Sequence, residues 1–256
     1  LLGCDGAHSW VRRYHRMGRV RETMIGFQID VTGYQHKEGK LDMYTGHKIA
    51  PGFFAWAIPT GTTTRIGTFS RPDLLGSRSS EETLTELINH ELWKHRFDGC
   101  SEVGRYCGPV PAKPIRKPAV GRVFVFGDAA GLCKPTTGGG IGPGFLHVDN
   151  SLELISNFIG SDRPNLNATD RLARQIIKPI MKRHNRARAL RDFFLTNSTD
   201  EELESIFRIW ARPDVIEIIQ KYGEIENPVP LGLKMLKDVP EFRRIAIRAA
   251  NSLVFA

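Results

Sequence analysis

A short apolar run that leads into a glycine-rich turn is the feature that most restricts how this chain can fold. The run Val123–Phe126 is followed by Gly127 and Asp128, and then by Gly138–Gly140 directly before Ile141. A strand of this kind delivers a carboxylate to its C-terminal end. The glycines let backbone approach a ligand closely, and a helix that begins next points its positive end at that ligand. Three consecutive glycines carry an entropic cost that a plain turn does not need, so the segment is interpreted as a ligand-binding turn.

The chemistry of this turn favours a flat, electron-accepting ligand. Asp128 can accept hydrogen bonds from sugar-like hydroxyls, and the amides from Gly139 to Ile141 can donate to a developing anion. This combination suits a flavin better than a bare phosphate. Reduced flavin is anionic along one edge, where a helix N-terminus with roughly half a positive charge would stabilise it. No side chain is needed for this, and the sequence identifies no catalytic acid and no proton donor.

Two motifs carry a resemblance to a known family. Gly127–Gly131, with Pro135 and Gly138–Ile141, resembles the second flavin motif of the geranylgeranyl reductase family, FAD-dependent enzymes of the aromatic-hydroxylase-like flavoprotein group. Gly3–Arg13 is similar to the Gly-Ala-Asp-Gly-x-x-Ser-x-Val-Arg stretch of the same group, with Cys4 in place of the alanine. The resemblance implies bound FAD. The residues that it implies for the cofactor are Asp5, Gly127, Asp128, Pro135, Gly138, Gly139, Gly140 and Ile141.

The first motif leaves one choice open. Asp5 and Arg12 could help to position the phosphates of the cofactor. Alternatively, Asp5 caps the turn that follows it while Arg12 forms an ion pair on the surface. Within the family resemblance, the cofactor role is favoured for Asp5.

A third motif resembles the lipid-site signature of the same family. Phe54–Pro59, followed by Gly67–Phe69, is similar to Tyr-x-Trp-x-Phe-Pro followed by Gly-x-Gly. The resemblance implies that Trp56 and Pro59 line a tunnel for an isoprenoid chain, and an apolar wall fits such a ligand. The alternative is an ordinary core tryptophan. Three positions depart from the signature and are all apolar: Phe54, Ile58 and Phe69.

The charge of the chain favours anionic partners. Its formal net charge is +8, and a basic stripe at helical spacing runs from Arg171 to Arg186. Within this stripe, Lys182 is a candidate for binding the phosphate headgroup of a substrate. The stripe could also face an acidic membrane surface, in peripheral contact, or be a solvated helix face. No nucleic-acid partner is expected, since neither a recognisable module nor basic residues interleaved with exposed aromatics occur.

Length and composition limit the class of protein. No apolar run reaches the ~18 residues that would suggest a membrane span, and no signal peptide opens the chain, so we expect a cytoplasmic protein. Its cysteines form no zinc pattern, and no metal site is predicted. The Gly-x-Gly-x-x-Gly fingerprint of dinucleotide-binding domains is absent, and the chain begins at Leu1. We therefore expect this chain to be the C-terminal portion of a longer protein and to bind FAD weakly when it is alone.

These observations predict a mixed α/β fold of the α+β type. Residues 1–22 and 104–160 are expected to form part of a Rossmann-like FAD-binding domain, residues 23–103 an inserted antiparallel substrate sheet, and residues 161–256 a helical region. Strands are expected at 24–31, 41–44, 53–58, 64–69 and 120–126. Helices are expected at 79–97, 143–159, 168–195, 200–210, 213–222, 230–237 and 240–254, with residues 103–118 as a basic, proline-rich connection.

The resemblance also implies an activity. A member of this family would saturate carbon–carbon double bonds of geranylgeranyl chains, with hydride delivered from N5 of reduced FAD. The substrate would be an archaeal-type membrane lipid or a related isoprenoid, and the sequence does not choose between NAD(P)H and a ferredoxin-type electron donor. Two alternatives stay open: an FAD-dependent monooxygenase or halogenase of the same group, and a lipid-binding fragment without catalysis.

Overall fold

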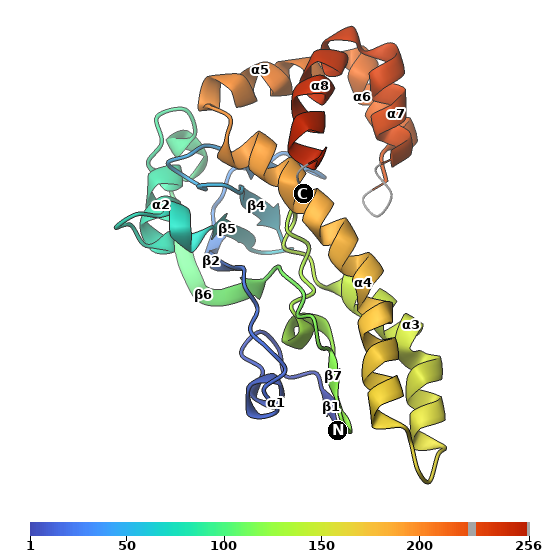
Figure 1. Ribbon diagram of the computed structural model, residues 1–256. Helices are drawn as coiled ribbons and strands as arrows, with labels where there is room; N and C mark the ends of the chain where they lie inside the picture. The colour runs from blue at the N-terminus through green and yellow to red at the C-terminus, as the bar shows by residue number, and fades with distance from the viewer. Residues whose placement is uncertain (225–228, 255–256) are drawn as a thin grey trace. The chain divides into compact units, whose positions relative to one another are not determined.

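The computed structural model describes residues 1–224 and 229–254, which form two compact units, Leu1–Ala187 and Arg188–Ala256 (Figure 1). Residues 225–228 and 255–256 of the predicted helical region lie outside the described part. The mixed α/β fold, with an antiparallel sheet and a helical C-terminal region, is confirmed. In the described ranges, no helix combines the length and the apolar character needed to cross a membrane.

The largest element of the first unit is a five-stranded antiparallel sheet with the order β3-β4-β5-β2-β6. Its strands are β2 (Thr23–Thr32), β3 (Asp42–Tyr44), β4 (Ala55–Pro59), β5 (Thr64–Ser70) and β6 (Ser101–Pro111). The expectation of a plain connection over residues 103–118 is wrong, because residues 101–111 pair with β2 along its whole length. β6 lies at the edge of the sheet, where prolines are tolerated, and its exposed residues give no hydrophobic alternation to read.

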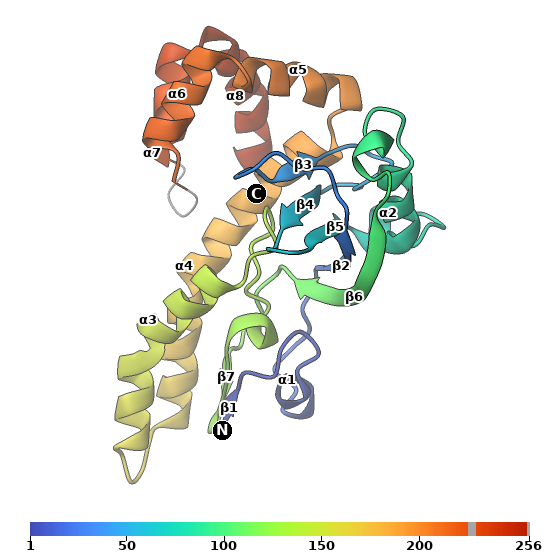
Figure 2. The same cartoon turned by 180° about the vertical axis from the view of Figure 1, so that it is seen from behind.

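One face of this sheet is covered by α2 (Ser80–Ile88), as both views show (Figures 1 and 2). The helix begins with a capping box, in which Ser79 and Glu82 exchange hydrogen bonds with each other's backbone amides. It ends at Ile88, well before the predicted end at residue 97. Asn89 forms the C-cap and its side-chain amide donates to the carbonyl of Thr85, which closes the last turn.

A second, three-stranded sheet has the order β1-β8-β7, with β1 (Leu2–Gly3) parallel to β8 (Val123–Val125). The expected single strand over residues 120–126 is instead a tight hairpin of β7 (Ala119–Val120) with β8. Val120 pairs with Val123 across a two-residue turn in which Gly121 has φ +62°. Glycine readily adopts that conformation, which reverses the chain there.

Two long helices complete the first unit. α3 (Ile141–Ile159) confirms the helix predicted after the glycine turn, and α4 (Leu166–Arg191) follows it. The two run side by side in both views, and Ala173 of α4 packs with Phe158 of α3 (Figures 1 and 2). Further along α4, Ile177 and Ile180 pack against Ala129 and Leu132, and so connect the helix to the glycine turn.

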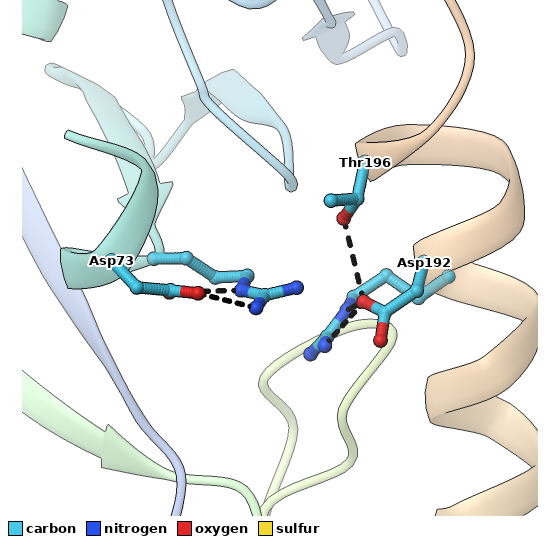
Figure 3. Close-up of polar contacts among 5 residues, drawn as sticks. Asp73, Asp192 and Thr196 are labelled. Carbon is cyan, nitrogen blue, oxygen red and sulfur yellow. Dashed lines mark hydrogen bonds and ion pairs between the residues drawn. The ribbon is translucent and has the colours of Figure 1, made fainter. Parts of the chain in front are cut away.

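The second unit is helical, as predicted. A π-helical turn, Asp192–Thr196, is followed by α5 (Asp200–Trp210), α6 (Pro213–Tyr222), α7 (Val229–Asp238) and α8 (Pro240–Val254). Its core contains Val215, Met235 and Val239. At the π-helical turn, Asp192 accepts hydrogen bonds from Arg191 and Thr196 (Figure 3). The same figure labels Asp73 of the first unit, whose carboxylate forms an ion pair with Arg71.

Candidate functional site

The predicted cofactor residues gather at one edge of the three-stranded sheet. Because β1 and β8 are parallel and Gly3 is in register with Val125, the residues after each strand leave the sheet on the same side. Asp5 follows β1, and Asp128 follows β8. The carboxyl end of parallel strands is where ligands of open α/β sheets bind.

The turn after β8 is built around the carboxylate of Asp128. Gly127, with φ +55°, begins a short 3₁₀ turn that ends at Gly131, with φ +80°. A Cβ atom at Gly140 would lie 2.7 Å from Oδ1 of Asp128, so the carboxylate lies against the backbone that opens α3. Only glycine at this position leaves room for the carboxylate at the positive end of the helix.

Cys133 holds this carboxylate in place. Its thiol is buried and donates to Oδ1 of Asp128 at 3.2 Å. Burial, together with the negative charge of Asp128, raises the pKa of the Cys133 thiol far above its ordinary value. A thiol that stays protonated is a hydrogen-bond donor and not a redox nucleophile, because the thiolate is the reactive form.

Unused hydrogen-bond donors lie beside the carboxylate. In the described part of the chain, the amides of Gly140, Ile141 and Gly142 donate to no acceptor, as is usual for the first turn of a helix. Gly139 is exposed, and a Cβ there would meet only Oγ1 of Thr137, at 3.4 Å. The fold by itself therefore does not demand glycine at position 139. A ligand lying against this backbone would require glycine there, because a side chain would occupy the space of the ligand.

The residues of the first motif, Gly3–Arg13, form hydrogen bonds within α1 and to the Asp128 turn. Asp5 accepts a hydrogen bond from the amide of Val11 at 3.0 Å. Burial works to raise the pKa of Asp5, but hydrogen bonds from Ser9 and from Val11 outweigh it, and the pKa lies below its ordinary value. Asp5 thus binds the first turn of α1 (Trp10–Tyr14), whose N-cap is Ser9, which is the geometry of the second alternative, while its exposed side chain stays accessible to a ligand.

Arg12 is not the surface ion pair of that alternative. Its side chain is only 7% exposed, and it donates to the carbonyls of Ala129 at 2.6 Å and of Ala7 at 3.0 Å. Burial lowers the pKa of Arg12, with a smaller contribution from the neighbouring Arg13. A guanidinium used in this way positions the Asp128 turn and does not reach toward phosphates.

The second face of the five-stranded sheet is aromatic and meets the glycine turn. Two glycines on this face make room for rings that lie across them: Trp56 over Gly67, and Phe69 over Gly26. The ring centroids of Trp56 and Phe69 are 4.7 Å apart. On its other side, Phe69 lies so close to Gly138 that a Cβ at that glycine would be 2.6 Å from the ring. Phe69 therefore joins the predicted lipid site to the predicted flavin turn.

The three predicted substrate residues are not all brought together. Trp56 is buried in the aromatic cluster, whereas Pro59 is three positions further along β4 and therefore points to the opposite face of the sheet. Lys182 lies on α4, with its side chain exposed. Pro135, from the cofactor set, is buried in the turn, and Ile141 is exposed at the first position of α3.

Two residues of the site were not identified as such from the sequence. Phe69 was noted only as a departure from the lipid-site signature, although its substitution for glycine marks where the space is filled. His184, on α4, is buried with its Nε2 atom 3.2 Å from the carbonyl of Leu132 and its Nδ1 atom 2.9 Å from that of Ile180. Nothing local to His184 in the sequence indicates that contact, which spans 52 positions.

The residues present fit an FAD group. A recessed carboxylate, unused amides and a glycine that the fold does not require surround one edge of the turn. An aromatic surface closes the adjoining side. These are the features that a flavin needs: polar contacts along one edge and an apolar partner across its plane.

Comparison with known proteins gives the same direction. No family model matches the chain. The chain is 34% identical over 172 residues to a digeranylgeranylglycerophospholipid reductase of Methanocaldococcus jannaschii, an alignment of 65% of this chain and 42% of that protein. It is 25% identical over 245 residues to an uncharacterized protein of the same organism, covering 93% of this chain and 60% of the relative. The chain thus spans between about two fifths and three fifths of these two relatives.

Solved structures share the fold. A geranylgeranyl bacteriochlorophyll reductase-like protein of Thermoplasma acidophilum superposes with a TM-score of 0.75 over 97% of this chain and 61% of its own, at 18% identity. The halogenase PltM, solved in complex with FAD, superposes with a TM-score of 0.60 over 90% of this chain and 52% of its own, at 11% identity. At these identities the likeness establishes the fold, and activity has to be argued from the site.

Proposed function

The chain is a homologue of the geranylgeranyl reductases and shares their fold, and from this premise we propose that it belongs to an FAD-dependent reductase of isoprenoid double bonds. The observation that carries the proposal is the contact of Phe69 with Gly138. It puts an aromatic, lipid-compatible surface directly beside the turn that would hold the flavin.

The residues that would hold FAD are those of the turn and of the first motif. In this proposal, Asp128 accepts hydrogen bonds from hydroxyl groups of the cofactor, and the amides from Gly139 to Ile141 donate to its anionic edge. Gly127, Pro135, Gly138 and Gly140 shape the backbone around it, and Asp5 contacts it from the end of β1. Bound FAD would supply the hydride for reduction of the double bond.

The chain's own contribution to catalysis is positioning and exclusion of water. An isolated alkene is a poor hydride acceptor, so much of the rate would come from holding it close and dry. Trp56 and Phe69 form a rigid ring pair for this purpose, and further apolar side chains are exposed on the same face of the sheet: Met43, Ile58 and Tyr106. An exposed apolar surface beside the buried Trp56 and the partly buried Phe69 suits a long hydrocarbon chain.

The headgroup of the substrate would lie elsewhere. Lys182 and the basic stripe of α4 are our candidates for a phosphate headgroup, or for peripheral contact with an acidic membrane. Pro59, which ends β4 on the opposite face from Trp56, would shape the strand end and not the tunnel wall. The names of the relatives refer to glycerophospholipid and diphosphate substrates, and we take over the geranylgeranyl chain that these substrates share.

The test uses protein produced from its complete reading frame. Its visible spectrum with added FAD comes first, followed by assay under argon with dithionite and digeranylgeranylglycerophospholipid. The expected result is a two-banded flavin spectrum and a mass increase of about 2 Da for each reduced bond. A protein that stays colourless with excess FAD would remove the basis of the proposal and favour a lipid-binding fragment.

The fold similarity to the halogenase gives the rival function. A halogenase or monooxygenase consumes oxygen, whereas the reductase needs none. The same preparation is therefore assayed under air and under argon. Lipid reduction under argon supports the proposal, and a reaction that occurs only with oxygen contradicts it.

A further inference from the structure

A basic hollow lies in the first unit, beside the segment whose Ile115 amide hydrogen-bonds to Ala130 of the Asp128 turn. It has a volume of about 350 Å³ and is formed by the loop from α1 to β2, the segment from β6 to β7, and the part of α4 around Met181. Six of its lining residues are cationic, and none is acidic: Arg16, Arg19, Arg21, Lys113, Arg116 and Lys117.

These six cations differ from other arginines of the molecule. Arg65, Arg105 and Arg212 each form ion pairs with nearby carboxylates. Within the described ranges, the side chains of the six form neither ion pairs nor hydrogen bonds. Like charges gathered in one concave place repel each other and create a strong positive potential. An anion bound there would relieve that repulsion.

The backbone conformation of Arg16 also indicates a functional role for the hollow. Arg16 has φ +51° and is the only residue other than glycine with a positive φ among those that the structure describes. It stands where α1 ends in a Schellman motif, because the amide of Arg16 donates to the carbonyl of Arg13 and that of Met17 donates to Arg12. Glycine is the usual residue there, since a side chain is strained in the left-handed conformation. The strained arginine side chain lines the hollow, and strain of this kind is concentrated at functional sites.

The hollow is rigid enough to bind a small ligand. Met17 and Ile115 are buried at its lining, and the amide of Ile115 donates to the carbonyl of Ala130 at 3.0 Å. Arginine offers planar, bidentate donors to phosphate oxygens, and several cations in one cavity call for more than one negative charge. Apolar side chains between the cations can cover the organic part of a phosphate ester.

We propose that this hollow is a binding site for a compound with a diphosphate group, separate from the edge of the turn that faces Phe69. Three compounds share that chemistry: a pyridine dinucleotide, an isoprenoid diphosphate and the diphosphate of FAD. The inference does not depend on the proposed reductase activity, because the site is defined by its charges and geometry and is tested by binding without turnover.

Isothermal titration calorimetry with inorganic pyrophosphate at low and at physiological salt tests the site. The expected result is saturable binding that weakens with salt, and that weakens about tenfold in Arg16→Gly and in the double variant Arg116→Gln/Lys117→Gln. Arg16→Gly should also keep or raise the melting temperature, since glycine removes the strain. A fold defect would lower both, so opposite changes identify a binding role.

The matched control removes two exposed arginines outside the hollow, Arg122→Gln/Arg163→Gln, and so lowers the net charge by the same amount as the double variant. It should change pyrophosphate binding less than twofold. Absence of binding in the wild type, or equal losses in control and test variants, would overturn the proposal. Binding of anionic vesicles, but not of pyrophosphate, through the same residues would also overturn it in favour of a membrane surface.

Competition then distinguishes the sources. The pyrophosphate titration is repeated in the presence of NADPH, of geranylgeranyl diphosphate and of FAD. Displacement by one of them at least tenfold more effectively than by the others identifies the source. Equal, weak displacement by all three supports a site for the free diphosphate ion.

Discussion

The two faces of the five-stranded sheet are built from different side chains. On one face, Ile66 and its aliphatic neighbours pack under Leu84 and Leu87 of α2. On the other, Trp56 and Phe69 lie across glycines and reach the flavin turn at Gly138. The first face is closed by the chain's own helix, while the second keeps large apolar side chains exposed. We infer that the α2 face stabilises the fold and that the aromatic face serves the ligand.

If that division holds, core substitutions on the α2 face should cost stability without affecting the ligand. Ile66→Ala removes a side chain that is 0% exposed, and we expect a loss of about 2–5 kcal/mol in the free energy of unfolding. Urea denaturation measures it, and FAD affinity should stay within about twofold. The matched variant is Ile58→Ala, which is 36% exposed on the aromatic face and should cost less than about 0.5 kcal/mol. Equal losses in the two variants would contradict the comparison.

Acid should lower the stability of the protein through His147, which packs beside the strand that leads into the glycine turn. His147 of α3 is 2% exposed, its ring lies 4.9 Å from that of Phe126, and its buried Nδ1 atom has no hydrogen-bond partner among the residues that the structure describes. Burial lowers the pKa of His147 from 6.5 to about 4. The folded state therefore resists protonation that the unfolded state accepts. The contribution of the neutral His147 to the free energy of unfolding is fully present above pH 6.5. It is lost as the pH falls toward 4, by about 3 kcal/mol at most.

The measurement is urea denaturation at pH 7 and at pH 4.5 for the wild type and for His147→Leu. Other groups titrate equally in both proteins, so the difference between their pH dependences isolates His147. The wild type should lose more stability than the variant on acidification. Identical losses would show that His147 does not titrate as its burial requires.

Much of the fold could be predicted because its signals are local. The glycine turn, the Ser79–Glu82 capping box and the helices of the second unit each depend on residues a few positions apart. β6 was not predicted because its signal is not local: this edge strand is fixed by its pairing with β2 and not by its own sequence pattern. The hairpin at Gly121 was hidden inside one apolar run whose turn is only two residues long.

The candidate site could be predicted only in part. Asp128 and the glycines stand in one continuous motif, so their proximity follows from the sequence. Arg12 could not be assigned, because the carbonyl that it contacts belongs to Ala129, 117 positions away. Trp56 and Pro59 are a different case: their odd spacing on a strand already places them on opposite faces, and the motif resemblance obscured that.

The affinity for FAD should be sensitive to a single methyl group added in the glycine turn. Gly140→Ala would put a carbon 2.7 Å from Oδ1 of Asp128 and 3.3 Å from the sulfur of Cys133. The carboxylate must then move, and we expect FAD affinity to fall about 100-fold, or about 2.7 kcal/mol. Flavin fluorescence titration measures the affinity. Gly144→Ala is the matched control, because a Cβ there meets only Gly127 at 3.7 Å and alanine favours the helix. Similar affinities in both variants would remove Asp128 from the proposed site.

The smallest effect is expected in a polar contact on the closed face. The hydroxyl of Tyr34 donates to Asp42 at 2.8 Å and lies 2.6 Å from the hydroxyl of Tyr44, and Arg96 also pairs with Asp42. Burial and the hydrogen bond with Tyr44 raise the pKa of Tyr34 above its ordinary value, so the hydroxyl stays protonated. Tyr34→Phe should therefore cost only about 1 kcal/mol, since Asp42 keeps Arg96 as a partner. Its FAD affinity should equal that of the wild type. A loss of flavin binding in this variant, with stability retained, would mean that the two faces are coupled through the sheet and that their division of labour is wrong.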